Sequence, residues 1–151
     1  SLLGGGGLPE LTEAQAEVMR IEAGVPKWGV DMNEETIPLE AGLLGRAISQ
    51  TKGCYVGQEV IVRVLHRGGG RVARRLMTLS FDPAGTTVPA AGTPLHARHD
   101  LGLEVGHITS AAFSKRLGRV VALAYVHRDH ATPGANVTVN GVPAVVEREC
   151  E

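Results

Sequence analysis

Residues 135–148, Ala-Asn-Val-Thr-Val-Asn-Gly-Val-Pro-Ala-Val-Val-Glu-Arg, carry the clearest structural signal in the sequence. Two short runs rich in valine flank the dipeptide Asn140-Gly141. Asn-Gly is among the strongest signals for a two-residue type I′ turn, because both of its positions need a positive φ. We therefore predict a β-hairpin whose strands span residues 135–139 and 142–148.

The chain from Val72 onward has the same texture of short runs separated by turn signals. Prolines, glycines and the tripeptide Asp100-Leu101-Gly102 mark the breaks. Several short strands at this spacing are typical of a small antiparallel barrel. The glycine-rich run 67–71 before them lacks the residues of a nucleotide-binding loop, so we interpret it as a linker. The further predicted strands are 76–81, 94–99, 103–109 and 119–127.

The periodicity before this linker is helical. Thr12 and Gln15 fit a capping box, and apolar residues then recur at helical spacing. We therefore expect a helix over residues 13–23, followed by a loop over 25–38. Weaker helical patterns cover 39–49 and 60–65. The expected fold class is α+β, with short helices and loops up to about residue 70 and a small antiparallel β-barrel after it.

The most unusual segment is Lys52-Gly53-Cys54-Tyr55-Val56-Gly57-Gln58-Glu59, which we call the octet. A free cysteine is often a buried, inert core residue, and this is the simpler interpretation of Cys54. Its neighbours favour a reactive thiol, because Lys52 and a helix that begins near Gly57 would both lower a cysteine pKa. We therefore expect Cys54 to be partly exposed and more acidic than an ordinary thiol. Glu59 is expected to cap that helix or to pair with Lys52.

The octet resembles the signature of the YgfZ family of folate-binding proteins, relatives of the glycine-cleavage T-protein, which is an aminomethyltransferase. The signature reads Lys-Gly-Cys-Tyr-x-Gly-Gln-Glu, and all seven fixed positions are present. The resemblance spans nearly the whole chain from about Leu11 onward. It continues in Arg20-Ile21-Glu22-Ala23-Gly24 with Trp28-Gly29 and Asp31, in Pro38-Leu39-Glu40-Ala41-Gly42, in Gly106-His107-Ile108-Thr109-Ser110 and in Ala122-Leu123-Ala124-Tyr125-Val126.

This resemblance implies both a domain organisation and a ligand. Residues 1–70 would be the C-terminal part of a folate-binding, T-protein-like domain, and residues 71–151 would be a C-terminal β-barrel domain. We therefore expect the chain to be the C-terminal portion of a longer protein. The implied cofactor is tetrahydrofolate or a derivative. The implied catalytic residues are Cys54 and Lys52, and the implied folate-binding residues are Arg20, Trp28, Gly53, Tyr55, Gly57, Gln58 and Glu59.

Two of these residues also have simpler interpretations. A single arginine such as Arg20 is most often a solvated surface residue. Trp28, the only tryptophan, is as consistent with a buried core residue as with a ligand contact. Metal-like spacing occurs in the histidine pairs 96/99 and 127/130, but no cysteine or carboxylate set completes either pair. We therefore expect exposed histidines rather than a metal site.

Composition argues against several classes of protein. Aromatic residues make up 3% of the chain and the net charge is −1, which disfavours a nucleic-acid surface. The two cysteines, Cys54 and Cys150, make no disulfide framework, so a reducing cytoplasm fits best. Cys150 is expected to be exposed and to have no role. No apolar run reaches the length of a membrane span, and no signal peptide is visible.

Three functions stay open. By resemblance, a YgfZ-type protein supports assembly or repair of iron–sulfur enzymes, including a tRNA-modifying one, so its partners are folate and iron–sulfur client enzymes. An aminomethyltransferase of glycine cleavage shares the Arg-x-Glu-x-Gly and barrel segments but usually lacks the octet, so Cys54 favours the first function. The third is a folate-free interaction scaffold. A hydrolase is disfavoured, because His66 lies too far along the chain from Cys54 to act as its base.

Overall fold

The computed structural model describes residues 10–49, 51–67, 69–82 and 87–150. Its helical elements precede its strands, as the change of periodicity near residue 71 predicts. The helical elements are α1 (Glu13–Ala23), α2 (Leu44–Ala47), α3 (Gln58–Val62) and the π-helical turn η1 (Arg63–Arg67). The strands are β1 (Arg74–Phe81), β2 (Pro94–Ala97), β3 (Asp100–Ser114), β4 (Arg119–His127), β5 (Asn136–Val139) and β6 (Val142–Glu149).

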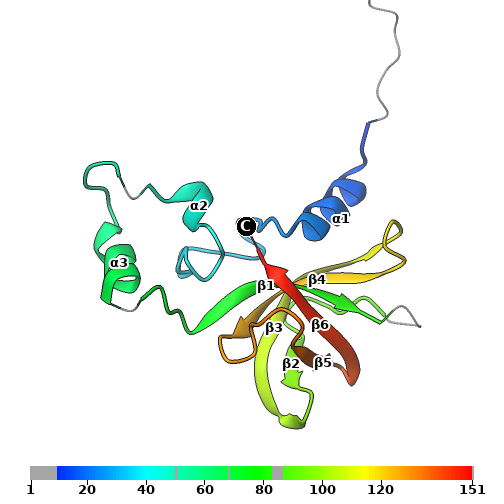
Figure 1. Cartoon of the computed structure of the whole chain (residues 1–151). Helices are drawn as coiled ribbons and strands as arrows, with labels where there is room; N and C mark the ends of the chain where they lie inside the picture. Colours follow the sequence, from blue (N-terminus) through cyan, green and yellow to red (C-terminus); the bar gives the residue numbers. More distant parts are fainter. Residues whose placement is uncertain (1–9, 50, 68, 83–86, 151) are drawn as a thin grey trace, which may run out of the picture.

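The strands close into one antiparallel barrel in the order β1-β4-β3-β2-β5-β6, which confirms the predicted architecture (Figure 1). Alternate residues of β1, namely Met77, Leu79 and Phe81, belong to the main apolar cluster. Leu76 belongs to a second cluster, which also contains Ile21 of α1. Because side chains alternate between the two faces of a strand, β1 is buried on both faces, by the barrel interior and by the α1 segment.

The last hairpin forms as predicted. Val139 pairs with Val142, and the two turn residues Asn140 and Gly141 have φ values of 51° and 79°. Strand β3 is longer than the predicted 103–109, because it begins at Asp100 and continues to Ser114 alongside β4. Small residues such as alanine and serine fill this extension and have little strand preference, which is why the sequence did not reveal it.

The helices agree with expectation in two places and differ in one. Helix α1 has the predicted capping box, in which the Thr12 hydroxyl accepts from the Gln15 N–H. The helix predicted over 60–65 forms as α3 and η1. The helix predicted over 39–49 is wrong, since only Leu44–Ala47 is helical. Gly42 has a φ of 72° there, which a helix cannot contain, so the chain turns before α2 begins.

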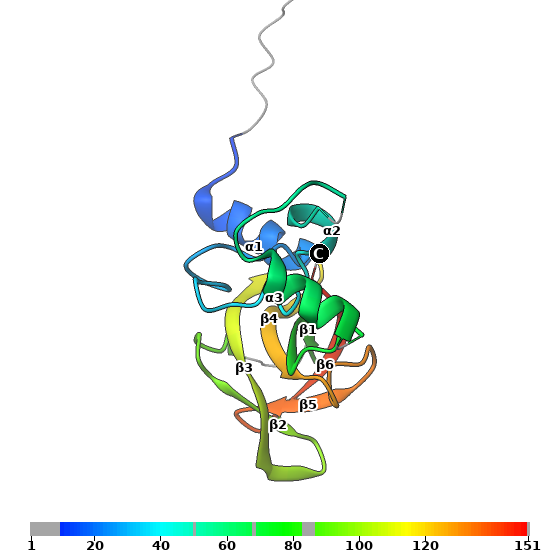
Figure 2. The ribbon, with the colours of Figure 1, turned by 90° about the vertical axis from the view of Figure 1, so that its left-hand side faces the viewer.

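Helix α3 is held against the segment before it by a third, smaller apolar cluster. Its buried members are Leu39, Ile61 and Val72, with Tyr55 partly buried beside them. Both views place α1 and α2 at one end of the barrel and the β2–β3 turn at the other (Figures 1 and 2). The octet therefore lies with the helical elements, outside the barrel.

Candidate functional site

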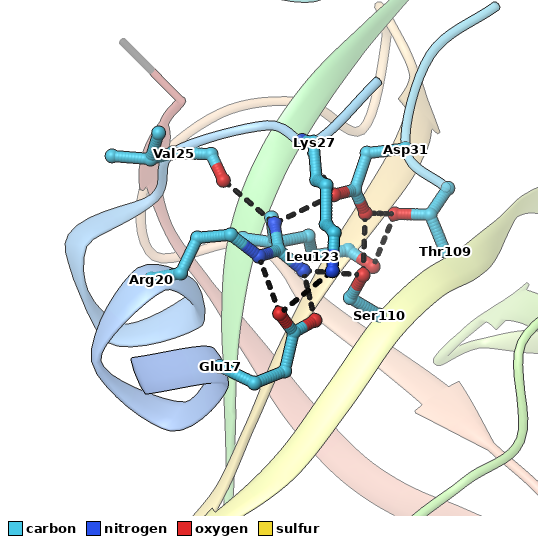
Figure 3. A network of polar contacts seen from close by, with 8 residues as sticks. All are labelled: Glu17, Arg20, Val25, Lys27, Asp31, Thr109, Ser110 and Leu123. Atoms are coloured by element: carbon cyan, nitrogen blue, oxygen red, sulfur yellow. Dashed lines mark hydrogen bonds and ion pairs between the residues drawn. The ribbon is translucent and has the colours of Figure 1, made fainter. Parts of the chain in front are cut away.

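Arg20 lies at the centre of a polar network that links α1 to the barrel (Figure 3). Its Nε and Nη2 atoms donate to the Glu17 carboxylate, at 3.1 and 2.6 Å. Nη1 donates to the Val25 carbonyl and to the Asp31 carboxylate, both at 2.6 Å, and Nη2 also donates to the Ser110 hydroxyl at 2.9 Å. These contacts use all five donors of a guanidinium group. The alternative of a solvated surface arginine is wrong, because the side chain is only 14% exposed.

Asp31 is the buried acceptor of this network. Its Oδ2 accepts from Arg20 and from the Lys27 N–H, the latter at 2.9 Å. Its Oδ1 accepts from the hydroxyls of Thr109 and Ser110 on β3. A buried carboxylate is tolerated where such bonds and a counter-charge compensate its lost hydration. Asp31 therefore fixes the 25–31 loop onto the barrel.

The acidic and basic side chains of this network stabilise one another in their charged forms. The bond from Arg20 lowers the pKa of Glu17, and the nearby Lys27 adds to the effect. Burial opposes the charged form of Arg20, but Glu17 and Asp31 outweigh it and raise the pKa of Arg20. In this arrangement Arg20 positions the loop. Direct contact between Arg20 and a folate stays a prediction, and it requires an exchange of one of these bonds.

Trp28 lies on the loop that the network fixes. It is 63% exposed, so the alternative of a buried core tryptophan is wrong. Its neighbour Gly29 donates to the Met32 carbonyl at 2.8 Å, which closes the tight turn that carries the ring. Trp28 borders a hollow together with Asn33, Glu34 and Glu35. An exposed aromatic face beside polar groups suits a flat ligand with a hydrogen-bonding edge.

The octet presents its cysteine to solvent. Cys54 is exposed, so the alternative of a buried core cysteine is wrong. Apart from its two chain neighbours, no described residue has an atom within 4 Å of the position that a Cβ on Gly53 would occupy, so there is open space next to the cysteine. Gly57 has a φ of 85° at the start of α3, a conformation that favours glycine.

The other polar groups of the octet have partners different from those expected. The Lys52 ammonium lies over the Tyr55 ring, 4.8 Å from its centroid. The Gln58 side chain accepts from the Tyr55 N–H at 3.3 Å. Glu59 pairs with Arg63 one helical turn later, and α3 has no side-chain cap. The expectation that Glu59 caps the helix or pairs with Lys52 is therefore wrong, because an i, i+4 partner of opposite charge is within easier reach.

The structure does not join the octet to the Arg20 network. Within residues 10–49, 51–67, 69–82 and 87–150, no hydrogen bond or ion pair connects an octet residue with Arg20 or Trp28. The sequence identified Asp31 and Ser110 only through the family resemblance and did not predict that they bind each other or Arg20. The one local signal was the i, i+3 spacing of Glu17 and Arg20.

Cys150 corrects another expectation. It is fully buried in the cluster with Leu76 and Ile21, and burial raises the pKa of its thiol to about 12. The sequence suggested exposure because Cys150 is next to last, but its N–H donates to the Leu76 carbonyl at 2.9 Å and extends the β6 pairing. In the part of the chain that the structure covers, no three cysteine, histidine or acidic side chains gather as metal ligands. None of the described helices is long and apolar enough to cross a membrane.

Comparison with known proteins agrees with this architecture. Residues 74–146 match the family described as the glycine cleavage T-protein C-terminal barrel domain. The chain is 32% identical over 123 residues to an aminomethyltransferase of Halothermothrix orenii, which covers 82% of this chain and 32% of the relative. It is 34% identical over 119 residues to an aminomethyltransferase of Streptomyces coelicolor, and this match covers 78% of this chain and 30% of the relative. The chain thus spans about a third of the length of the curated relatives it matches.

A solved structure shows the same fold. The crystal structure of glycine cleavage system aminomethyltransferase T from Bartonella henselae superposes with a TM-score of 0.74. The match covers 87% of this chain and 36% of that protein, at 23% sequence identity. This likeness concerns the fold. The match of the barrel and the similarity to the two aminomethyltransferases support the glycine-cleavage T-protein-like superfamily.

Proposed function

Given this relationship to the glycine-cleavage T-protein-like superfamily, we propose that the chain is part of a folate-binding protein of the YgfZ type. In this proposal, residues 1–70 complete a folate-binding domain and residues 71–151 form the barrel domain of a cytoplasmic protein. The bound cofactor is tetrahydrofolate or a derivative. The protein supports assembly or repair of iron–sulfur enzymes, and Cys54 is the residue through which it acts.

The observation that carries this proposal is the exposure of Cys54 within an intact octet. A cysteine that is retained for packing is normally buried, as Cys150 is. The open space beside Gly53 allows a second molecule to reach the sulfur. No hydrogen bond between described residues joins Cys54 to a histidine, and a nucleophile for hydrolysis requires such a base. Redox or transfer chemistry at sulfur or at an iron–sulfur centre fits this environment better.

The folate part of the proposal rests on Trp28 and its surroundings. The exposed ring offers a flat face for a pterin, and the turn closed by Gly29 fixes the backbone that carries it. Arg20 keeps this loop on the barrel through Asp31. Arg20 and the octet residues Lys52, Gly53, Tyr55, Gly57, Gln58 and Glu59 stay candidate contacts or assisting groups in the bound state.

Trp28 also provides the test, because it is the only tryptophan in the chain. Titration with a reduced folate is expected to quench its fluorescence, since a stacked pterin changes the environment of the indole. Calorimetry on the same samples gives the dissociation constant independently, and Trp28→Leu is expected to weaken binding. This chain alone should bind folate much more weakly than the intact protein of which it is part, because part of the cleft lies outside it. If calorimetry detects no folate binding by that intact protein, the folate proposal fails.

The similarity to aminomethyltransferases supports a second candidate, a folate enzyme that transfers an aminomethyl group. The two candidates differ in their dependence on Cys54. If the protein has the YgfZ-type role, Cys54→Ser abolishes its support of an iron–sulfur client enzyme in cells, while folate binding persists. If it is an aminomethyltransferase, purified protein forms a one-carbon-substituted folate, and this activity survives Cys54→Ser.

A further inference from the structure

A cavity of about 280 Å³ lies beneath the loop that carries Trp28. Loop residues such as Gly29, Asn33 and Thr36 form its roof. Its floor comes from three strands of the barrel: Arg74 on β1, His107 on β3 and Tyr125 on β4. This volume is close to the lower limit of ligand pockets, roughly 300 Å³, so the cavity suits a small group rather than a whole drug-sized molecule.

The Tyr125 hydroxyl is the unusual feature of this cavity. Tyr125 is only 4% exposed, and its hydroxyl oxygen is buried without a hydrogen-bond partner among the described residues. The neighbouring Thr36 hydroxyl instead donates to the Asn33 side chain and accepts from the Asn33 N–H. Burial raises the pKa of Tyr125, and the charges of Glu40 and Asp31 add to this effect. The Thr36 hydroxyl and the charge of Arg74 oppose it, but Thr36 does not reach hydrogen-bond geometry with the Tyr125 oxygen. The hydroxyl is therefore protonated at neutral pH. A buried hydroxyl without a partner is costly unless a ligand or water supplies an acceptor.

Arg74 adds a positive charge beside this hydroxyl. Its guanidinium group lies over the Tyr125 ring, 4.5 Å from the centroid, and its Nε donates to Glu40 at 3.0 Å. Among the described residues, no acceptor binds its Nη atoms. The Nη groups of an arginine form a fork that matches the two oxygens of a carboxylate.

His107 completes the set of donors. Its ring lies 5.7 Å from the Tyr125 ring, centroid to centroid. Burial and the charge of Arg74 lower the pKa of His107, and Glu104 opposes them only in part. The imidazole is therefore neutral at pH 7 and can donate one N–H.

The acidic side chains around the cavity are paired with donors or screened by solvent, so they do not prevent an anion from binding. Asp31 is compensated by Arg20 and by three further donors, as described above. Glu40 faces Arg74 and is only 7% exposed at its side chain. Glu35 lines the cavity but is exposed to solvent, where its charge is screened. The floor of the cavity therefore presents mainly donors.

From this arrangement we infer that the cavity is a carboxylate-binding subsite, in which the carboxylate accepts from the Tyr125 hydroxyl, the free Nη groups of Arg74 and the His107 ring. The carboxylate belongs either to a small free acid or to the glutamyl tail of a folate. The chemistry of recognition is the same for both sources.

The test uses the chain labelled with ¹³C at its tyrosines, of which there are two. Glutarate is the probe, and ¹H–¹³C correlation spectra report the rings of Tyr125 and Tyr55 separately. Glutarate at millimolar concentration is expected to shift the Tyr125 signals and to leave those of Tyr55 in place. Absence of a Tyr125 shift, or an equal shift at Tyr55, overturns the proposal.

Substitution then assigns the binding to the hydroxyl. Tyr125→Phe keeps the ring and is expected to raise the calorimetric Kd for glutarate about tenfold, a typical effect of one hydrogen bond to a charged group. Because the lost hydroxyl has no partner in the protein, Tm is expected to stay unchanged or to rise. An unchanged Kd, or a lowered Tm that shows the hydroxyl to be bonded within the protein, contradicts the inference.

Two further arms complete the experiment. Arg74→Gln is expected to weaken glutarate binding at least tenfold, whereas Arg98→Gln, an exposed arginine outside the cavity, leaves Kd unchanged. N-(4-aminobenzoyl)-L-glutamate that binds much more tightly than glutarate identifies the folate tail as the source, and equal affinities identify small free acids. Glutarate binding without any quenching of Trp28 by folate separates this subsite from the folate proposal.

Discussion

Cys54 and Cys150 are the same residue type in opposite environments, which makes them a matched pair. Cys54 is exposed, whereas Cys150 is buried and its pKa is raised to about 12. We expect iodoacetamide near neutral pH to alkylate Cys54 in the folded protein and to spare Cys150, because a buried, protonated thiol is neither accessible nor nucleophilic. Peptide mass spectrometry after timed quenching measures both rates in one sample.

Denatured protein supplies the control for this prediction, since there both cysteines should react at similar rates. Lys52→Met tests the expected assistance to Cys54. A slower reaction of Cys54 in this variant supports the assistance, and an unchanged rate removes Lys52 from the proposed site. Equal rates for Cys54 and Cys150 in the folded protein would contradict their placement.

Asp31 carries the second prediction at this scale. Asp31→Asn keeps the shape of the side chain but removes the charge that faces the buried guanidinium of Arg20. We expect the free energy of unfolding to fall by about 3 kcal/mol, the usual cost of removing one partner from a buried ion pair. Urea unfolding measures this change. Glu34→Gln, in the same loop but exposed, is the control and should change stability by less than about 0.5 kcal/mol.

At the scale of single elements, β3 depends on one glycine. A Cβ on Gly106 would lie 1.9 Å from the Tyr125 carbonyl oxygen on β4, and backbone atoms cannot move aside as a side chain can. We expect Gly106→Ala to destabilise the protein by about 3 kcal/mol, at the upper end of overpacking costs. Gly45→Ala is the control, because nothing lies within 4 Å of its Cβ position, and it should be neutral or stabilising. A Gly106→Ala variant as stable as the control would contradict the close approach of β3 and β4.

Elements with strong local signals could be predicted from the sequence. The Asn140-Gly141 turn and the Thr12 capping box fix their hairpin and helix through contacts within a few residues. The true extents of β3 and α2 could not be predicted. The second half of β3 is held by pairing with β4, and the 39–49 segment is interrupted by the positive φ of Gly42. Both depend on tertiary contacts or backbone angles that periodicity does not contain.

In the candidate site, too, one feature could be predicted from local sequence and another depended on tertiary contacts. Exposure of Cys54 follows from its glycine-flanked, polar octet and was predicted. The Arg20 network was not, because Ser110 lies 90 residues from Arg20 and Thr109 lies 78 residues from Asp31. Residues so far apart in the sequence come into contact only when α1 packs beside β3 in the folded protein. The orphan hydroxyl of Tyr125 is likewise a property of the assembled cavity.

At the scale of the whole molecule, carboxylates of α1 hold the helix to the barrel. Glu17 binds Arg20, which binds Ser110 of β3. Glu22 accepts from the Ser114 hydroxyl at the end of β3 and from Arg116 in the following turn. These bonds favour the ionised acids: the bond from Arg20 lowers the pKa of Glu17, and the bonds from Ser114 and Arg116 lower that of Glu22. The attachment of α1 is therefore linked to pH.

The sign of this linkage gives the last prediction. A carboxyl whose pKa is lower in the folded protein than its ordinary value of 4.5 stabilises the fold above that value. This stability is lost as the pH falls below 4.5 through the lowered pKa, where the folded protein must also take up the proton. We therefore expect the free energy of unfolding, measured with urea at successive pH values, to decrease on acidification below about 4.5. Glu22→Gln should lower stability at neutral pH and flatten this decrease, while the exposed control Glu34→Gln should follow the unmodified chain. A Glu22→Gln curve parallel to that of the unmodified chain would show that Glu22 does not help to hold α1, and would leave the apolar contacts of Ile21 and the Glu17–Arg20 bonds to do so.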